Sequence, residues 1–258
     1  MFYLAKFYWK EAIAYRAQMF FTVINTPLRF FVLVFIWSAL YEMNGIDKIQ
    51  GFSLSMLISY FMINTFLTIF TYDDVHQFLE DKIRHGNFVV YMLKPVSVVW
   101  LQFIKKIAVR AFAMIVEILP VLGIFLIFFT DYFVLGAVFP FMISALFAFI
   151  IAYLIFLIVG TLAFWFVNIR SFSWLVSLGI QFASGMLLPL DLFPQTAQRI
   201  LAYLPFQYMS YTPTMIYLGR IDDLITAFLM QGFWILFLGI LAAFLWRMAI
   251  KRFSGVGA

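Results

Sequence analysis

Two isolated charges, Arg29 and Glu117, are the residues of this sequence best placed for chemistry inside a membrane, because each lies in a long apolar run. A charge inside a bilayer is costly, so it is usually paired or lines a transport path. Counted from the same side of the membrane, the two residues lie at similar depth, and we predict a structural ion pair between them. Arg110 is an alternative partner for Glu117, because residues seven apart share one helix face. A proton relay through Glu117 is less well supported, since relays normally need several such groups.

Catalytic and metal-binding chemistry finds no support in the residue types. The chain has no cysteine and only two histidines, His76 and His85, which excludes thiolate chemistry and multi-histidine metal centres. No lysine precedes a serine or threonine, as a phosphate-binding loop requires, and no G-x-S-x-G elbow occurs. Both histidines lie near acidic residues, where a solvated helix face explains them better than an acid–base site. We therefore predict that the chain is not an enzyme and holds no cofactor of its own.

Composition indicates the environment in which these residues must be positioned. The chain has 258 residues, of which 66% are hydrophobic and 11% are charged. Soluble domains are about half apolar and about a quarter charged. The apolar runs are continuous, which favours membrane helices over the alternating strands of a barrel. The sequence thus predicts an all-α polytopic membrane protein with one domain over residues 1–258. Its net charge of +5 fits a basic cytoplasmic side, and no nucleic-acid partner is expected.

Six runs are long enough to cross a bilayer, which needs about 20 apolar residues. They cover residues 20–42, 52–72, 111–129, 135–167, 172–190 and 225–246. The fourth is too long for one perpendicular helix, so it could tilt, extend beyond the membrane, break near Pro140 or form two re-entrant pieces. Six spans with both termini in the cytoplasm put thirteen basic residues inside and three outside, in agreement with the positive-inside rule. The amino terminus lacks the order of a cleavable signal, so the first span is expected to remain as an anchor.

Two polar segments on the predicted cytoplasmic side have helical patterns. Residues 1–19 interleave basic and aromatic residues, which predicts a helix in the membrane interface, with a snorkelling basic tail as the alternative. Residues 73–95 begin with an amphipathic stripe at helical spacing, formed by Val75, Phe78, Leu79 and Ile83. Thr71 and Asp74 resemble a capping box at its start, and Gly86 is expected to end it. We predict a short, capped helix of a shape suited to docking.

The segment before the last span, residues 186–224, is both apolar and rich in proline, with Pro189, Pro194, Pro205 and Pro213. A hydrated loop would be more polar, so we predict short helices that re-enter the outer leaflet. Four single polar residues are expected to form hydrogen bonds between helices rather than to contact a ligand: Asn25, Asn64, Gln181 and Gln231.

The order of these features resembles the permease subunits of type-2 ATP-binding-cassette exporters over nearly the whole chain. Two stretches carry the resemblance. The first is Asp81-Lys82-Ile83-Arg84-His85-Gly86 followed by Tyr91-Met92-Leu93-Lys94-Pro95, and the second is Gly185-Met186-Leu187-Leu188-Pro189 with Phe193-Pro194 and Leu204-Pro205-Phe206. Both are similar to small bacterial permeases linked to the export of antibiotics, viologens or other amphiphiles.

The resemblance implies a dimer, built from two copies of this chain or from this chain and a similar permease, in a bacterial plasma membrane. Each half would rest on a cytosolic ATPase subunit that binds ATP and magnesium. Residues 73–86 would be the coupling helix, with Phe78, Leu79, Asp81, Arg84 and Gly86 as its contact residues. Residues 186–218 would form an extracellular re-entrant region over the path, marked by Pro189, Pro194, Pro205 and Phe206. The expected substrate is amphiphilic or hydrophobic, such as a drug, lipid, peptide or glycan.

Two alternatives belong to other functional classes. A secondary transporter driven by an ion gradient would use Glu117 and Arg29, and it should show several buried ionisable groups along a path and broken helices in matched halves. The sequence offers two such groups and no matching halves. An intramembrane enzyme would need convergent catalytic groups, which the residue types do not provide.

Overall fold

The computed structural model describes residues 16–71, 73–166 and 168–253 of the chain. In these ranges every regular element is a helix, and an isolated bridge joins Ile49 to Phe52. The all-α prediction is therefore confirmed. The predicted interfacial helix over residues 1–19 lies almost wholly outside the described residues, and the first described helix begins at Arg16.

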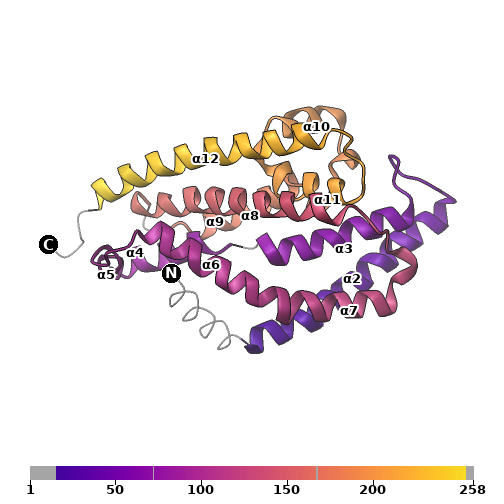
Figure 1. Ribbon diagram of the computed structural model, residues 1–258, viewed down its shortest axis with the longest axis horizontal. Coiled ribbons are helices and arrows are strands. Elements are labelled where there is room, and N and C mark those ends of the chain that lie inside the picture. The colour runs from indigo at the N-terminus through magenta and orange to yellow at the C-terminus, as the bar shows by residue number, and fades with distance from the viewer. Residues whose placement is uncertain (1–15, 72, 167, 254–258) are drawn as a thin grey trace.

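Long helices run roughly along the longest axis of the molecule, and shorter ones cluster at its ends (Figure 1). In chain order the helices are α2 (Arg16–Asn44), α3 (Leu54–Thr71), α4 (Val75–Arg84), α5 (Val89–Met92), α6 (Val98–Ala113), the π-helical turn η1 (Met114–Ile118), α7 (Leu119–Phe128), η2 (Thr130–Tyr132), α8 (Val138–Thr161), η3 (Leu162–Phe164), α9 (Arg170–Ala183), η4 (Leu190–Leu192), α10 (Gln195–Ala202), η5 (Pro205–Met209), α11 (Tyr211–Tyr217) and α12 (Leu224–Arg252).

Among the described residues, five helical stretches are long and apolar enough to cross a bilayer: Phe20–Asn44, Leu54–Arg84, Val98–Phe128, Val138–Phe164 and Leu224–Arg252. Each contains most or all of one predicted span. The predicted fifth span corresponds to α9, which has 14 residues. At 1.5 Å per residue, such a helix reaches about 21 Å, short of a hydrocarbon core of about 30 Å. Six membrane crossings therefore stay a prediction, which depends on whether α9 crosses the bilayer.

The third stretch begins earlier than predicted, at Val98 instead of residue 111. Lys106 and Arg110, expected in a cytoplasmic loop, are consequently part of a continuous helix. This helix passes through η1 just before Pro120. Proline lacks an amide proton and its ring clashes with the carbonyl four residues earlier. A π-helical turn relieves that clash by widening the helix, so the chain continues into α7 without leaving the helix.

The fourth stretch is one helix and does not break at Pro140. Pro140 lies in the first turn of α8, where backbone amides have no partner within the helix and proline is tolerated. Helix α8 is the centre of the molecule, since it packs against α3, α4, α11 and α12. At Gly160 the approach of α4 is so close that a Cβ atom would lie 2.8 Å from the Cα of His76.

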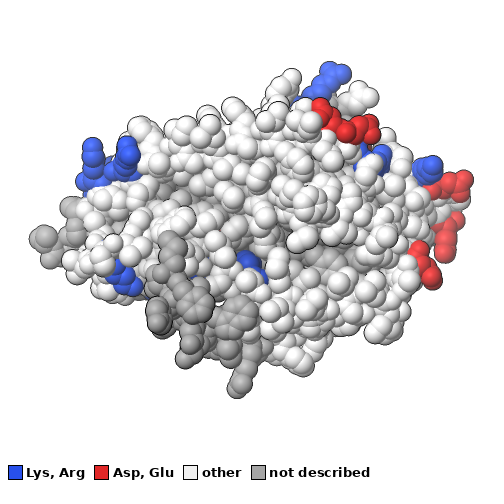
Figure 2. Space-filling view, in the orientation of Figure 1, with Lys and Arg blue, Asp and Glu red and all other residues white. Residues whose placement is uncertain are grey.

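Charged side chains gather at the two ends of the molecule, and the band between them is almost uncharged (Figure 2). In this view the end with α4, α5 and the last turns of α12 shows Lys and Arg, whereas the opposite end shows both signs. The last turn of α12 contains Lys251 and Arg252. An apolar band between two charged ends is the arrangement expected of a protein that spans a bilayer.

Candidate functional site

The site is built around the junction of α3 and α4. Helix α3 ends at Thr71, whose hydroxyl donates to the carbonyl of Leu67 over 2.9 Å. The predicted capping box of Thr71 and Asp74 is therefore wrong. Asp73 replaces it, because its Oδ1 accepts the amide of Val75 at 2.6 Å. The side chain of Asp74 instead forms an ion pair with Lys106 on α6.

Helix α4 has the predicted amphipathic pattern, but the structure shows what its apolar face covers. Val75 and Leu79 are each 1% exposed and pack with Tyr153 and Leu157 of α8. The Cδ1 atom of Leu79 would lie 2.9 Å from a Cβ atom placed on Gly160. The apolar face thus fills a groove of this chain itself. In this conformation Leu79 is not available as an anchor for a partner.

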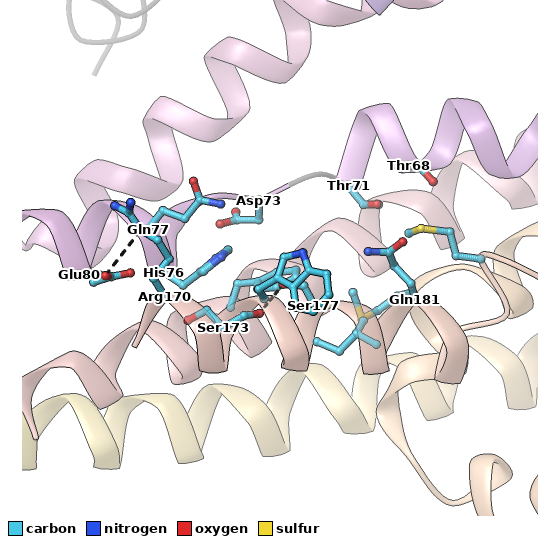
Figure 3. Close-up of a pocket in the computed structure, with 15 residues that line it drawn as sticks. Thr68, Thr71, Asp73, His76, Gln77, Glu80, Arg170, Ser173, Ser177 and Gln181 are labelled. Atoms are coloured by element: carbon cyan, nitrogen blue, oxygen red, sulfur yellow. Dashed lines mark hydrogen bonds and ion pairs between the residues drawn. The ribbon is translucent and has the colours of Figure 1, made fainter. Parts of the chain in front are cut away.

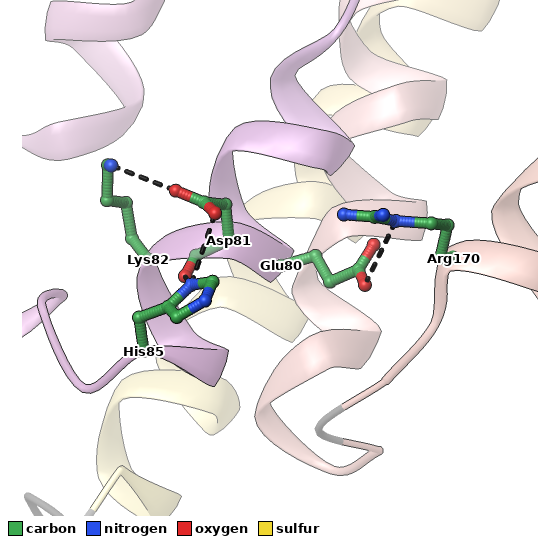
Figure 4. Close-up of polar contacts among 5 residues, drawn as sticks. All are labelled: Glu80, Asp81, Lys82, His85 and Arg170. Atoms are coloured by element: carbon green, nitrogen blue, oxygen red, sulfur yellow. Dashed lines mark hydrogen bonds and ion pairs between the residues drawn. The ribbon is translucent and has the colours of Figure 1, made fainter.

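The carboxyl end of α4 carries the accessible charges (Figure 4). The Asp81 carboxylate lies 2.9 Å from the Lys82 ammonium and 3.2 Å from His85. Arg84 is exposed, and Gly86 ends the helix with a φ of +69°, which glycine adopts at little cost. Phe78 is half-buried and meets the Tyr91 ring edge-on at 5.1 Å. Of the five predicted coupling residues, Asp81, Arg84 and Gly86 are accessible, Phe78 is partly so, and Leu79 is buried.

Helix α6 ties this junction to the rest of the fold through basic side chains. Lys106 is buried and is held by Asp74, as described above. One turn further on, Arg110 donates to the carbonyl of Ile69 over 2.9 Å. Movement of α4 would therefore be transmitted to α6 through the ion pair of Asp74 with Lys106, and from α6 to the last turn of α3 through the bond from Arg110 to Ile69.

A cavity of about 680 Å³ lies between the end of α3, α4, α8 and α9 (Figure 3). Sites for small molecules are commonly about 300–1,000 Å³. Its walls include Asp73, His76 and Glu80 from the α3–α4 region and Ser173 from α9. These four side chains are between 2% and 4% exposed. A polar chamber thus lies directly beside the buried face of α4.

At one end of this cavity, Arg170 approaches Glu80 with 3.9 Å between Nε and Oε1 (Figure 4). That distance is an ion pair but exceeds hydrogen-bond length. The Arg170 side chain is 71% exposed whereas Glu80 is almost fully enclosed. Sequence reasoning placed His76 and its acidic neighbours on a solvated helix face and assigned no role to Glu80. Helical spacing records which residues share a face, but nothing in the sequence indicated that α9 would pack beside that face.

Asn64, which bonds to the cavity-lining residue Met186, is one of the polar residues predicted to bond between helices. Its side-chain amide donates to the carbonyls of Gly185 and Met186, both at 3.2 Å, and its oxygen accepts from the hydroxyl of Ser210. Gly185 has a φ of +79°, which lets the chain turn sharply after α9. Asn64 thus makes tertiary hydrogen bonds from α3, as predicted, but its partners lie in the segments after α9 and before α11 and not within a helix.

Gln231 also matches its prediction. From α12 its side chain donates to the carbonyls of Ser144 at 3.2 Å and Tyr208 at 3.1 Å, and it accepts from the Ser144 hydroxyl at 3.0 Å. These bonds join α12, α8 and η5 within an otherwise apolar interface.

Residues 186–218 form short helical pieces punctuated by proline, as the sequence predicts. Pro189 and Pro194 directly precede η4 and α10, and Pro205 begins η5. Phe206 packs partly buried against the cluster that contains Ile151 and Leu238. The position of this region relative to a membrane stays a prediction.

The two intramembrane charges are not brought together. Phe30 and Val34 form the buried face of α2, and Arg29 is exposed on another face. Glu117 is buried in η1, where the charge of Arg110 acts on it. Among the described residues no ion pair joins Arg29 to Glu117, and the cation near Glu117 is the alternative partner, Arg110.

Comparison with protein families places these features in context. A model of the ABC-2 family of transporter proteins matches residues 7–257, almost the entire chain. The chain belongs to the ABC-2 transporter family. As an ABC-2 permease subunit it is a membrane component of transport that works with an ATP-binding-cassette subunit. A comparison with curated protein sequences gave no match. The family assignment confirms the resemblance found in the sequence, and it does not single out the antibiotic or viologen subgroup.

Proposed function

We propose that this ABC-2 permease subunit forms the translocation path of an ATP-driven exporter for amphiphilic or hydrophobic substrates. The ATP and magnesium would be bound by a separate cytosolic ATPase subunit. The observation that carries the proposal is the position of α4, whose charged end is accessible while its apolar face is locked against α8 beside a polar cavity. Such a helix can transmit a push from a partner into the wall of a binding chamber.

The coupling surface is narrower than the sequence alone suggests. Leu79 belongs to the core of this chain, so the ATPase contact is carried by Asp81, Arg84 and Gly86 with Phe78 at its margin. The links from Asp74 to Lys106 and from Arg110 to the Ile69 carbonyl would carry movement of α4 into the membrane-spanning helices.

The orientation that we propose puts α4 and both termini in the cytoplasm of a bacterial cell. Phe88, which follows α4, meets Trp246 of α12 edge-on, and both belong to the cluster that contains Val75 and Leu79 of α4, so the basic last turn of α12 lies at the same end of the molecule as α4. Basic residues concentrate on the cytoplasmic side of membrane proteins. A second permease, either identical or similar, would complete the path.

Reversing one charge tests the coupling surface. Arg84→Glu should lower the amount of ATPase subunit that co-purifies with the permease about tenfold or more, because like charges across an interface cost several kcal/mol. Arg199→Glu, which changes an exposed arginine on α10, is the matched control and should retain the partner. Equal recovery of the ATPase with both variants would remove Arg84 from the coupling surface. Leu79→Ser is unsuitable for this purpose, since it would damage the core.

A further inference from the structure

The polar cavity contains buried atoms that this chain leaves without hydrogen-bond partners. Among the described residues these are Asp73 Oδ2, His76 Nδ1, Glu80 Oε1 and Ser173 Oγ. All four side chains line the cavity and are more than nine-tenths buried. A buried polar group without a partner costs about 1–3 kcal/mol, and more when it is charged. Four of them around one chamber indicate that something else occupies it.

The types of these atoms restrict what that occupant can be. Ionised carboxylates only accept hydrogen bonds, and the serine hydroxyl and the imidazole can do so as well. The cavity therefore needs donors, and two carboxylates favour donors that carry positive charge. Arg170 does not fill this need, because it lies 3.9 Å from Glu80 and extends mostly into solvent. Lys106 is paired with Asp74 and its charge also acts on Asp73, so Glu80 is the carboxylate that most needs a donor from the occupant.

The remaining walls suit an organic body rather than a bare ion. The His76 ring stacks on Phe156 with 4.9 Å between centroids, and Trp174 adds a second aromatic side chain. Met186 and Met209 line the cavity together with Gln181. Aromatic faces attract cations, and methionine adapts to apolar groups of varied shape. Within the described residues, no cluster of three or more acidic or histidine side chains is arranged to hold a metal ion.

We propose that this cavity binds amphiphiles that carry a protonated amine, with the ammonium group at the Glu80 carboxylate and the apolar body against Phe156, Trp174 and the methionines. The inference rests on the proposed export function, of which it names the substrate class. Glu80 is the decisive residue. Its carboxylate makes no hydrogen bond among the described residues, whereas Asp73 also holds the amide of Val75.

The test uses one probe in two forms. Monodansylcadaverine is a fluorescent primary amine, and its N-acetyl derivative has the same body without the charge. Binding of both is measured by fluorescence anisotropy on the full-length permease in lipid nanodiscs, together with whatever ATPase subunit co-purifies with it. The wild type should bind the amine at least tenfold more tightly than the acetylated form. Glu80→Gln should abolish most of this preference, and Asp131→Asn, which changes an exposed acid in η2, should preserve it.

Further variants separate a site from a folding defect. Ser177→Phe, which fills the cavity from α9, should weaken binding of both probes, while the melting temperature of each variant reports its folding. Equal binding of the two probes by the wild type, or an unchanged preference in a folded Glu80→Gln variant, overturns the proposal and leaves water as the occupant. The same preparations are assayed for ATP hydrolysis. A complex that hydrolyses ATP without amine preference overturns only this inference, whereas a permease that shows amine preference but never retains an ATPase subunit overturns the export function alone.

Discussion

Gly160 is the residue on which the position of α4 depends. A methyl group there would lie 2.8 Å from the Cα of His76, a backbone atom that cannot swing aside. The absence of a side chain at this one position allows α4 to lie against α8 and to enclose Glu80 and Asp73. Gly160 therefore allows α4 to take the position in which it forms one wall of the cavity.

We expect Gly160→Ala to destabilise the protein by about 1–3 kcal/mol, the usual cost of overpacking a tight contact. Thermal unfolding of the purified protein measures the effect. Gly239→Ala on α12 is the control, because nothing lies within 4 Å of its added methyl group and alanine favours helix more than glycine does. Similar melting temperatures for the Gly160→Ala variant and the wild type would show that α4 is not held as closely as described.

At the scale of elements, the sequence predicts helices better than it predicts what they pack against. The stripe through Val75 and Leu79 correctly indicates an amphipathic helix, because periodicity records which side chains share a face. The stripe suggested that a partner protein covers this face. In the structure α8 of the same chain covers it instead. The Thr71 cap failed for a similar reason, as Asp73 and Asp74 were free to divide the capping and ion-pairing roles between them.

The amino terminus of α12 is capped by Asp223, and the strength of this cap depends on pH. Asp223 accepts hydrogen bonds from the hydroxyl of Thr226 at 2.5 Å and from its amide at 3.0 Å. The bond from the Thr226 hydroxyl, followed by that from its amide, lowers the pKa of the Asp223 carboxyl below its usual value of 3.8. Because the folded pKa is the lower one, the cap is fully stabilising above pH 3.8 and is lost as the pH falls through the folded pKa.

We therefore expect Asp223→Ala to speed hydrogen exchange of the Thr226 amide at pH 7, and to do so much less at a pH below the folded pKa of Asp223. Exchange monitored by mass spectrometry over residues 222–230 measures this difference. Asp222→Ala removes an adjacent exposed acid and serves as the control. A difference between wild type and Asp223→Ala that stays constant across this pH range would contradict the capping role.

At the scale of the whole molecule, hydrophobicity predicts the class of fold. The ends of the long helices depend instead on how individual charged residues are paired. Four of the predicted spans lie within or nearly match helices of sufficient length, and the third starts earlier because the charges of Lys106 and Arg110 are satisfied inside the fold. The cavity could not be predicted, since it combines residues from α3, α4, α8 and α9 that no sequence pattern links. Only the packing of α9 beside α4 brings them together.

Whether α9 crosses the membrane can be tested with single cysteines, because the chain has none of its own. The controls are Lys251→Cys in the last turn of α12, expected inside, and Asp47→Cys between α2 and α3, expected outside. Asn168→Cys and Gln195→Cys flank α9, and all four positions are exposed. In intact cells a membrane-impermeant maleimide should label positions 47 and 195 and leave positions 168 and 251 unlabelled until the cells are opened. If α9 only dips into the membrane, positions 168 and 195 will share one side. One of the two controls will then also change sides, because an odd number of crossings cannot keep the orientation of both the first and the last helix.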